Sequence, residues 1–247
     1  MIEFEFEFQY AEAKLPILRQ VGGGIPLGRC VVLCGGSGCG KSTLLRCING
    51  LIPQFYEGEL KGFCRLNGQD TAGLRIGEIG ELAASVFQDP RSQFFTVNSS
   101  NEVAFSLENH GLPQDEIRRR VDEAFRIFHL ERLKDRNVYA LSSGERQLIF
   151  IARAIMKDAP VIILDEATAN VDPENEKELM EAVAELTHDK TATMIAHRLK
   201  TVRHADQIFV VDHGEIVQQD THDELVAVDG LYRRFVVERQ QAAGWKV

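Results

Sequence analysis

Hydrophobic and polar residues alternate over the first ten positions, and short apolar runs replace this alternation further along the chain. Phe4, Phe6 and Phe8 alternate with glutamates, which is the period-two pattern of a half-buried strand. Later apolar runs predict buried strands at residues 29–34, 84–88, 161–164, 191–196 and 208–211. Helices are expected at residues 41–49, 175–186 and 231–240.

The stretch 89–158 has a helical pattern. Two apolar stripes recur at helical spacing, and core packing is the simplest interpretation of both; they are Ile117, Val121, Ala124, Phe125 and Phe128, then Leu148, Ile149, Ala152, Ile155 and Met156. Strands that alternate with helices predict an α/β fold with a mostly parallel sheet covered on both faces. We expect one domain, with a catalytic α/β core over residues 1–88 and 159–247 and an inserted helical subdomain over residues 89–158.

Composition and charge exclude several classes of protein. The 247 residues are 44% hydrophobic and 26% charged, as in an ordinary globular chain, and the net charge of −9 disfavours a nucleic-acid partner. No run of eighteen apolar residues occurs, and the acidic start does not resemble a signal peptide. The five cysteines have no spacing typical of zinc sites and are expected to be free thiols in a reducing compartment. These features predict a cytosolic protein.

A glycine-rich segment between a predicted strand and a predicted helix carries the clearest chemistry. Gly35, Gly40, Lys41 and Ser42 satisfy the pattern G-x-x-x-x-G-K-[ST] of a phosphate-binding loop. Glycines allow backbone N–H groups to turn toward phosphate oxygens, and a helix N-terminus favours anions. Lys41 is expected to reach the outer phosphates, and the Ser42 hydroxyl to bind Mg²⁺. The residues predicted to contact ATP here are Gly35, Gly36, Ser37, Gly38, Cys39, Gly40, Lys41, Ser42 and Thr43.

Two carboxylates follow the apolar run 161–164. Asp165 is expected to support Mg²⁺ at the end of this strand. Glu166 is expected to lie near the γ-phosphate, where it could orient or deprotonate the attacking water. The alternative is a pair of solvated acids at a strand end, but the phosphate loop in the same chain favours the catalytic interpretation.

With these motifs, the chain resembles the ATP-binding cassette (ABC) family over nearly its whole length. The resemblance implies a RecA-like P-loop NTPase fold with an N-terminal antiparallel β part. It implies that Tyr10 stacks on adenine and that Gln88, in Val86-Phe-Gln-Asp-Pro90, contacts Mg²⁺ or the attacking water. Asp172 matches the loop that crosses the dimer interface, and His197 the switch histidine that contacts the γ-phosphate.

Residues 141–147, Leu-Ser-Ser-Gly-Glu-Arg-Gln, resemble the signature motif of this family. The resemblance implies that Ser142, Ser143, Gly144 and Glu145 meet ATP bound by a second cassette subunit, in a head-to-tail homodimer or heterodimer. Ser143 replaces a glycine of the commonest pattern, and Glu145 replaces a glutamine. A working site is expected if the backbone angles of Ser143 suit a non-glycine residue; the alternative is a degenerate signature in an asymmetric dimer.

The two halves of the chain resemble different subfamilies. Residues 1–147 resemble energy-coupling-factor uptake ATPases, through the segments 87–95, 102–105 and 141–145. The part from about residue 152 resembles the nucleotide-binding domains of exporters, through the segments 165–174, 195–199 and 230–235. A recombined or engineered chimera joined between about residues 141 and 157 is one hypothesis, and a natural subfamily is the other.

The resemblance implies Mg²⁺-dependent ATP hydrolysis that powers transmembrane subunits, with the chain peripheral at the inner face of the cell membrane. Uptake is favoured over export because the expected docking subdomain lies in the uptake-like half. Phe94 and Phe95 are candidate docking residues, with ordinary core packing as the alternative. Two rival functions are a non-transport ABC ATPase of DNA repair or translation, which lacks support from coiled-coil heptads or a tandem cassette, and a folded but inactive chimera.

Overall fold

The computed structural model describes residues 1–87, 93–166, 190–195, 202–203 and 205–244. Its first sheet has four antiparallel strands in the order β2-β1-β4-β5. These strands are β1 (Ile2–Tyr10), β2 (Leu18–Ile25), β4 (Gly58–Leu66) and β5 (Gln69–Asp70). The antiparallel N-terminal part expected from the family resemblance is therefore confirmed.

The second sheet has six strands in the order β10-β9-β3-β8-β7-β6, and all neighbours are parallel except β9 and β10. Its strands are β3 (Cys30–Cys34), β6 (Ala83–Val86), β7 (Val161–Asp165), β8 (Thr191–Ile195), β9 (Gln207–Asp212) and β10 (Glu215–Asp220). The predicted α/β fold with a mostly parallel sheet is confirmed, and each of the five apolar runs forms a strand of this sheet. The strand predicted at residues 84–88 covers Ala83–Val86.

Alternation in β1 sets the packing of the N-terminal sheet. Ile2, Phe4, Phe6 and Phe8 are all at most 3% exposed, because they face α1 (Lys41–Ile48) and one face of the six-stranded sheet. The glutamates point to the opposite, solvated face, where Glu7 forms an ion pair with Lys61 of β4. Period-two patterning thus places one face of β1 in the core.

Residues on the other face of the six-stranded sheet pack in one hydrophobic cluster with residues from helices of the middle and C-terminal parts of the chain. Alternate residues of β3 show the division, since Val31 packs toward α1 whereas Val32 packs toward the helical side. The remaining helices of the described residues are α2 (Leu51–Gln54), α3 (Ile76–Leu82), α4 (Ser99–Asn109), α5 (Gln114–Ile127), α6 (Ser143–Met156), α9 (His222–Ala227) and α10 (Leu231–Gly244), with 3-10 turns η2 (Glu131–Leu133) and η3 (Val138–Ala140).

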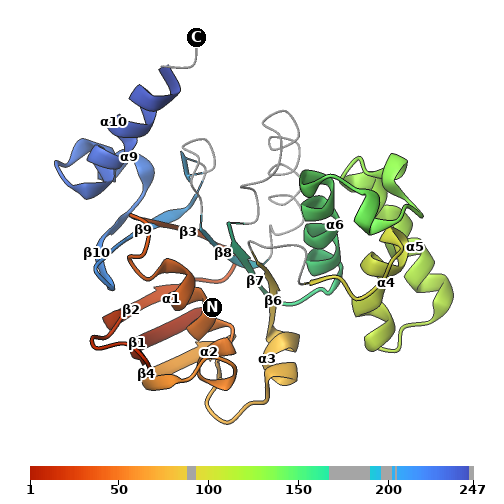
Figure 1. The fold of residues 1–247 in the computed structure, drawn as a ribbon, viewed down its shortest axis with the longest axis horizontal. Helices are drawn as coiled ribbons and strands as arrows, with labels where there is room; N and C mark the ends of the chain where they lie inside the picture. Colours follow the sequence, from red (N-terminus) through yellow and green to blue (C-terminus); the bar gives the residue numbers. More distant parts are fainter. Residues whose placement is uncertain (88–92, 167–189, 196–201, 204, 245–247) are drawn as a thin grey trace.

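Helices α4, α5 and α6 lie between β6 and β7 in the sequence and form a lobe beside the sheet (Figure 1). Both predicted apolar stripes lie in this lobe, on α5 and α6, and they pack into one core. The helical insertion is therefore confirmed, while its boundaries at residues 89 and 158 stay a prediction. None of the helices in the described ranges has the length and hydropathy needed to cross a bilayer.

Candidate functional site

The glycine-rich loop joins β3 to α1 in a conformation that requires glycine. Gly35 has φ of +148° and Gly40 has φ of +107°, a region that L side chains rarely adopt. A Cβ on Gly35 would lie 2.1 Å from the carbonyl oxygen of Val211, and one on Gly40 would lie 3.1 Å from that of Ile17. The loop is therefore packed between the end of β9 and the start of β2, which fixes its shape.

Lys41 opens α1 with its ammonium group turned back over this loop. The side chain is only 6% exposed, and Nζ donates hydrogen bonds to the carbonyl oxygens of Gly35 (3.1 Å) and Gly36 (2.7 Å). In the described part of the chain it has no carboxylate partner, and the first turn of α1 holds no acidic residue. A buried cation beside an uncapped helix N-terminus fits a polyphosphate ligand.

The Sγ atom of Cys39 lies 3.6 Å from Lys41 Nζ, and Cys39 itself is 7% exposed. All five cysteines are free thiols, as expected. A group attached to the Cys39 sulfur would therefore lie close to the lysine ammonium. This contact makes Cys39 the natural chemical probe of the loop.

Ser42 and Asp165 bring two oxygen atoms together at the ends of α1 and β7. The Ser42 hydroxyl donates to Asp165 Oδ1 over 3.1 Å. Burial raises the pKa of Asp165 and the charge of Glu166 raises it further, whereas the hydrogen bond from Ser42 lowers it. Hydroxyl and carboxylate oxygens are the ligands that Mg²⁺ prefers, so this pair fits a magnesium ion.

Glu166 follows β7 with φ of +52°, which is uncommon for a residue with a side chain. Such backbone conformations occur often at functional sites, where the surrounding structure holds them in place. Glu166 is half-buried and adjoins the Ser42–Asp165 pair. The charge of Glu166 acts on Asp165, so the turn places a second carboxylate within electrostatic range of the proposed metal-binding oxygens.

Tyr10 ends β1 beside the phosphate loop. Its hydroxyl lies 3.2 Å from Thr43 Oγ1, and its ring packs edge-on against Phe8 with a centroid distance of 4.7 Å. The structure thus brings Tyr10, the loop and the acidic pair to one region. Sequence reasoning missed Arg46, which donates to the Tyr10 hydroxyl; its position one turn after Ser42 on the predicted helix was the available signal.

The signature segment lies at the N-terminus of α6, in the helical lobe and away from α1 (Figure 1). Ser142 is the N-cap, and its hydroxyl accepts from the N–H of Glu145 while the Glu145 carboxylate accepts from the N–H of Ser142. This capping box, and an ion pair with Arg132, hold the pKa of Glu145 below its usual value. Ser143 is the first helical residue, a conformation that needs no glycine.

Three predicted site residues, Gln88, Asp172 and His197, lie outside the described residues. The predicted site residues that the structure describes form two groups, one around the phosphate loop and one around the signature segment. Their separation in one chain agrees with the expectation that each group needs a partner from elsewhere.

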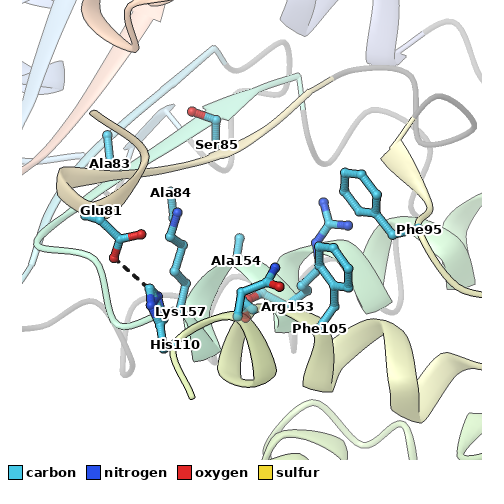
Figure 2. A pocket seen from close by; sticks show the side chains of 12 residues that line it. Glu81, Ala83, Ala84, Ser85, Phe95, Phe105, His110, Arg153, Ala154 and Lys157 are labelled. Atoms are coloured by element: carbon cyan, nitrogen blue, oxygen red, sulfur yellow. Dashed lines mark hydrogen bonds and ion pairs between the residues drawn. The ribbon is translucent and has the colours of Figure 1, made fainter. Parts of the chain in front are cut away.

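A cavity of about 230 Å³ lies between the sheet core and the helical lobe (Figure 2). Figure 2 shows Glu81 and His110 in contact at one end and the rings of Phe95 and Phe105 at the other. Phe95 is 67% exposed and stacks on Phe105, whereas Phe94 packs on Phe150 in the core. Of the two candidate docking residues, Phe95 is thus on the surface and Phe94 is largely structural.

Comparison with known proteins gives consistent results. The family profile described as "ABC transporter" matches residues 18–169. A putative ABC transporter ATP-binding protein of Treponema denticola is 36% identical over 91% of this chain and 46% of its own length. The chain spans less than half the length of the curated relatives it matches first.

Two solved structures resemble the fold equally well. CbiO1 of Clostridium perfringens, described as part of the ABC transporter complex cbiONQ, has a TM-score of 0.81 and 29% identity, covering 96% of this chain and 93% of CbiO1. A bacterial Atm1-family ABC exporter with ATP bound has a TM-score of 0.82 and 27% identity, covering 96% of this chain and 41% of the exporter. Both matches extend over the uptake-like and the exporter-like half.

Proposed function

The chain belongs to the ABC transporter family, and from this premise we propose that it binds ATP with Mg²⁺ and hydrolyses it to power a membrane transporter. The observation that carries the proposal is the joint geometry of the phosphate loop and β7. The buried Lys41 ammonium, which has no ion-pair partner among the described residues, and the Ser42–Asp165 oxygen pair meet at one helix N-terminus. These are the groups needed to hold a triphosphate and its metal ion.

In this proposal the residues of the chain act mainly by holding the phosphates, the metal ion and the attacking water in place. Lys41 and the loop N–H groups bind the phosphates, while Ser42, Asp165 and Gln88 hold Mg²⁺, which neutralises phosphate charge when bound. Glu166 orients the attacking water and accepts its proton. His197 contacts the γ-phosphate, and Tyr10 stacks on the adenine.

Each site is completed by a second cassette arranged head to tail. Ser142, Ser143, Gly144 and Glu145 of the partner subunit would approach the γ-phosphate, with the N-terminus of α6 supplying N–H donors. Because Glu145 is held by the Ser142 N–H and by Arg132, its negative charge is already compensated within its own subunit. That compensation supports a working signature over a degenerate one.

We propose uptake as the direction of transport, with the chain peripheral at the inner face of the membrane through transmembrane subunits. The support is the likeness to CbiO1 over 93% of its length and the uptake-like helical half. The exposed Phe95 at the cavity of Figure 2 is the proposed docking residue. Export stays the alternative, since the exporter likeness has the same quality.

A steady-state ATPase assay on the purified chain tests this function. Mg²⁺-dependent release of phosphate that is lost in Lys41→Ala supports it, because that substitution removes the buried ammonium. Absence of turnover in a folded chain at saturating Mg-ATP would favour the inactive chimera.

A further inference from the structure

Arg46 and Tyr56 form an arrangement with Tyr10 that the proposed function does not use. Arg46, on α1, donates from Nη1 to the Tyr10 hydroxyl over 3.4 Å. The guanidinium carbon of the same arginine lies 4.6 Å from the ring centroid of Tyr56. Tyr56 lies two residues before the start of β4 at Gly58, and Gly58 pairs with Tyr10, so both tyrosines stand at the same end of this sheet.

The hydrogen bonds have a direction. A guanidinium can only donate, so the Tyr10 oxygen accepts from Arg46. The Tyr10 O–H is then available to donate to Thr43 Oγ1, 3.2 Å away. Hydrogen bonds linked in this way polarise one another, and this chain of bonds leads from Arg46 through Tyr10 to Thr43, the residue after Ser42.

We propose that Arg46 is a positioning residue for nucleotide binding: it fixes the ring of Tyr10 as a platform for the base, and Tyr56 holds Arg46 in place. The inference rests on the proposed nucleotide site and identifies how this chain orients its base-binding ring. Without the arginine, the Tyr10 hydroxyl loses one of its two hydrogen-bond partners among the described residues and keeps Thr43, while the ring keeps its edge-on contact with Phe8. The Arg46 guanidinium is itself held by stacking on the ring of Tyr56.

A positioning role through the base ring predicts a selective effect. Arg46→Gln should weaken MgATP binding about three- to tenfold, the range expected for one lost hydrogen bond. Binding of inorganic tripolyphosphate should weaken less than MgATP binding, because tripolyphosphate has no base to stack and senses only the loss of the Arg46 charge, which also acts on Asp165. Tyr10→Phe keeps the ring and removes the hydrogen bonds to both Arg46 and Thr43, so it should weaken MgATP binding at least as much.

The double variant Arg46→Gln/Tyr10→Phe supplies the decisive comparison. If both substitutions break one hydrogen-bond chain, the double variant should bind MgATP no more weakly than the weaker-binding single variant. Tyr56→Leu should also weaken binding, whereas Tyr56→Phe should not. Arg65→Gln is the matched control, since Arg65 likewise stacks on an aromatic ring of this sheet, at 5.0 Å from Phe63, but makes no contact with Tyr10.

The experiment is calorimetric titration of the full chain with MgATP and with tripolyphosphate, with thermal unfolding as a check on folding. Wild-type binding that Lys41→Ala abolishes establishes the proposed nucleotide site independently; its absence would overturn that site and this inference with it. Where wild-type binding holds, three results overturn the inference alone. In the first, Arg46→Gln binds MgATP with an affinity within twofold of wild type. In the second, Arg46→Gln weakens the binding of tripolyphosphate as much as that of MgATP. In the third, the loss of MgATP affinity in the double variant equals the product of the losses in Arg46→Gln and Tyr10→Phe. If Tyr56→Leu and Tyr56→Phe bind MgATP equally well, Tyr56 has no part in holding Arg46 in place.

Discussion

The buried ion pair between Glu102 and Arg153 gives the sharpest prediction about stability. Glu102, on α4, is 0% exposed, and the Arg153 side chain, on α6, is 14% exposed. One Glu102 oxygen pairs with Arg153, while the other accepts from the N–H groups of Phe95 (3.1 Å) and Thr96 (2.9 Å). The pair thus joins two helices of the lobe to the segment that carries the exposed Phe95.

Arg153→Met would leave a buried carboxylate without its cation. Removing one partner of a buried ion pair costs about 3–5 kcal/mol. For a chain of this size 1 kcal/mol shifts the melting temperature by about 2–4 °C, so a decrease of about 6–20 °C is expected. The double variant Glu102→Leu/Arg153→Met removes both charges and should recover a large part of that loss.

Thermal unfolding followed by circular dichroism measures the effect. The exposed pair of Arg119 and Glu116 provides the control, and Arg119→Gln should leave the melting temperature unchanged. A melting temperature of Arg153→Met within 2 °C of wild type would refute the reasoning. So would a double variant that is less stable than the single one.

Three further predictions concern the site. Alkylation of Cys39 should block ATP binding, as measured by titration with a fluorescent ATP analogue; full ATP affinity after complete modification would contradict the placement of its sulfur. Gly35→Ala should abolish ATP binding because its Cβ would collide with Val211, whereas Gly36→Ala, whose Cβ meets no atom within 4 Å, should fold like wild type. If thermal unfolding and ATP titration show the same effect for both variants, Gly35 is not packed against Val211 in this way. The folded-state pKa of Glu145 is lowered, so its charge stabilises the fold above the ordinary glutamate pKa of about 4.3. Urea unfolding should find Glu145→Gln less stable than wild type at pH 7, with a difference that disappears as the pH falls through the lowered pKa; a constant difference would exclude this cause.

The strands of the large sheet could be predicted because burial on both faces leaves continuous apolar runs, such as residues 161–164. Strand β2, by contrast, contains Gly22, Gly23 and Gly24 and has no such pattern. Its small residues follow from tertiary packing, since a Cβ on Gly23 would lie 3.2 Å from the rings of Phe4 and Phe209. A contact between residues so distant in the sequence leaves no local signal.

The candidate site likewise contains residues that a local sequence pattern predicts and residues that only tertiary packing brings together. The spacing of the glycine-rich motif predicted Lys41 and Ser42, and the end of the apolar run 161–164 predicted Asp165. Arg46 and Tyr56 have no motif of their own and come together only when α1 packs against the end of the antiparallel sheet. Likewise, Ser142 and Glu145 were recognised as a signature, while Arg132 required the folded lobe.

The central claim is that the phosphate loop of one subunit is completed by the signature of another, and ATP-dependent dimerisation tests it most directly. The measurement is the sedimentation mass of Glu166→Gln with and without Mg-ATP, alongside its ATPase rate. We predict slow hydrolysis and a dimer that forms with ATP, and a Glu166→Gln/Ser142→Arg variant that still binds ATP but stays monomeric. Hydrolysis by Glu166→Gln at the wild-type rate, or a monomer with ATP bound, would contradict the account.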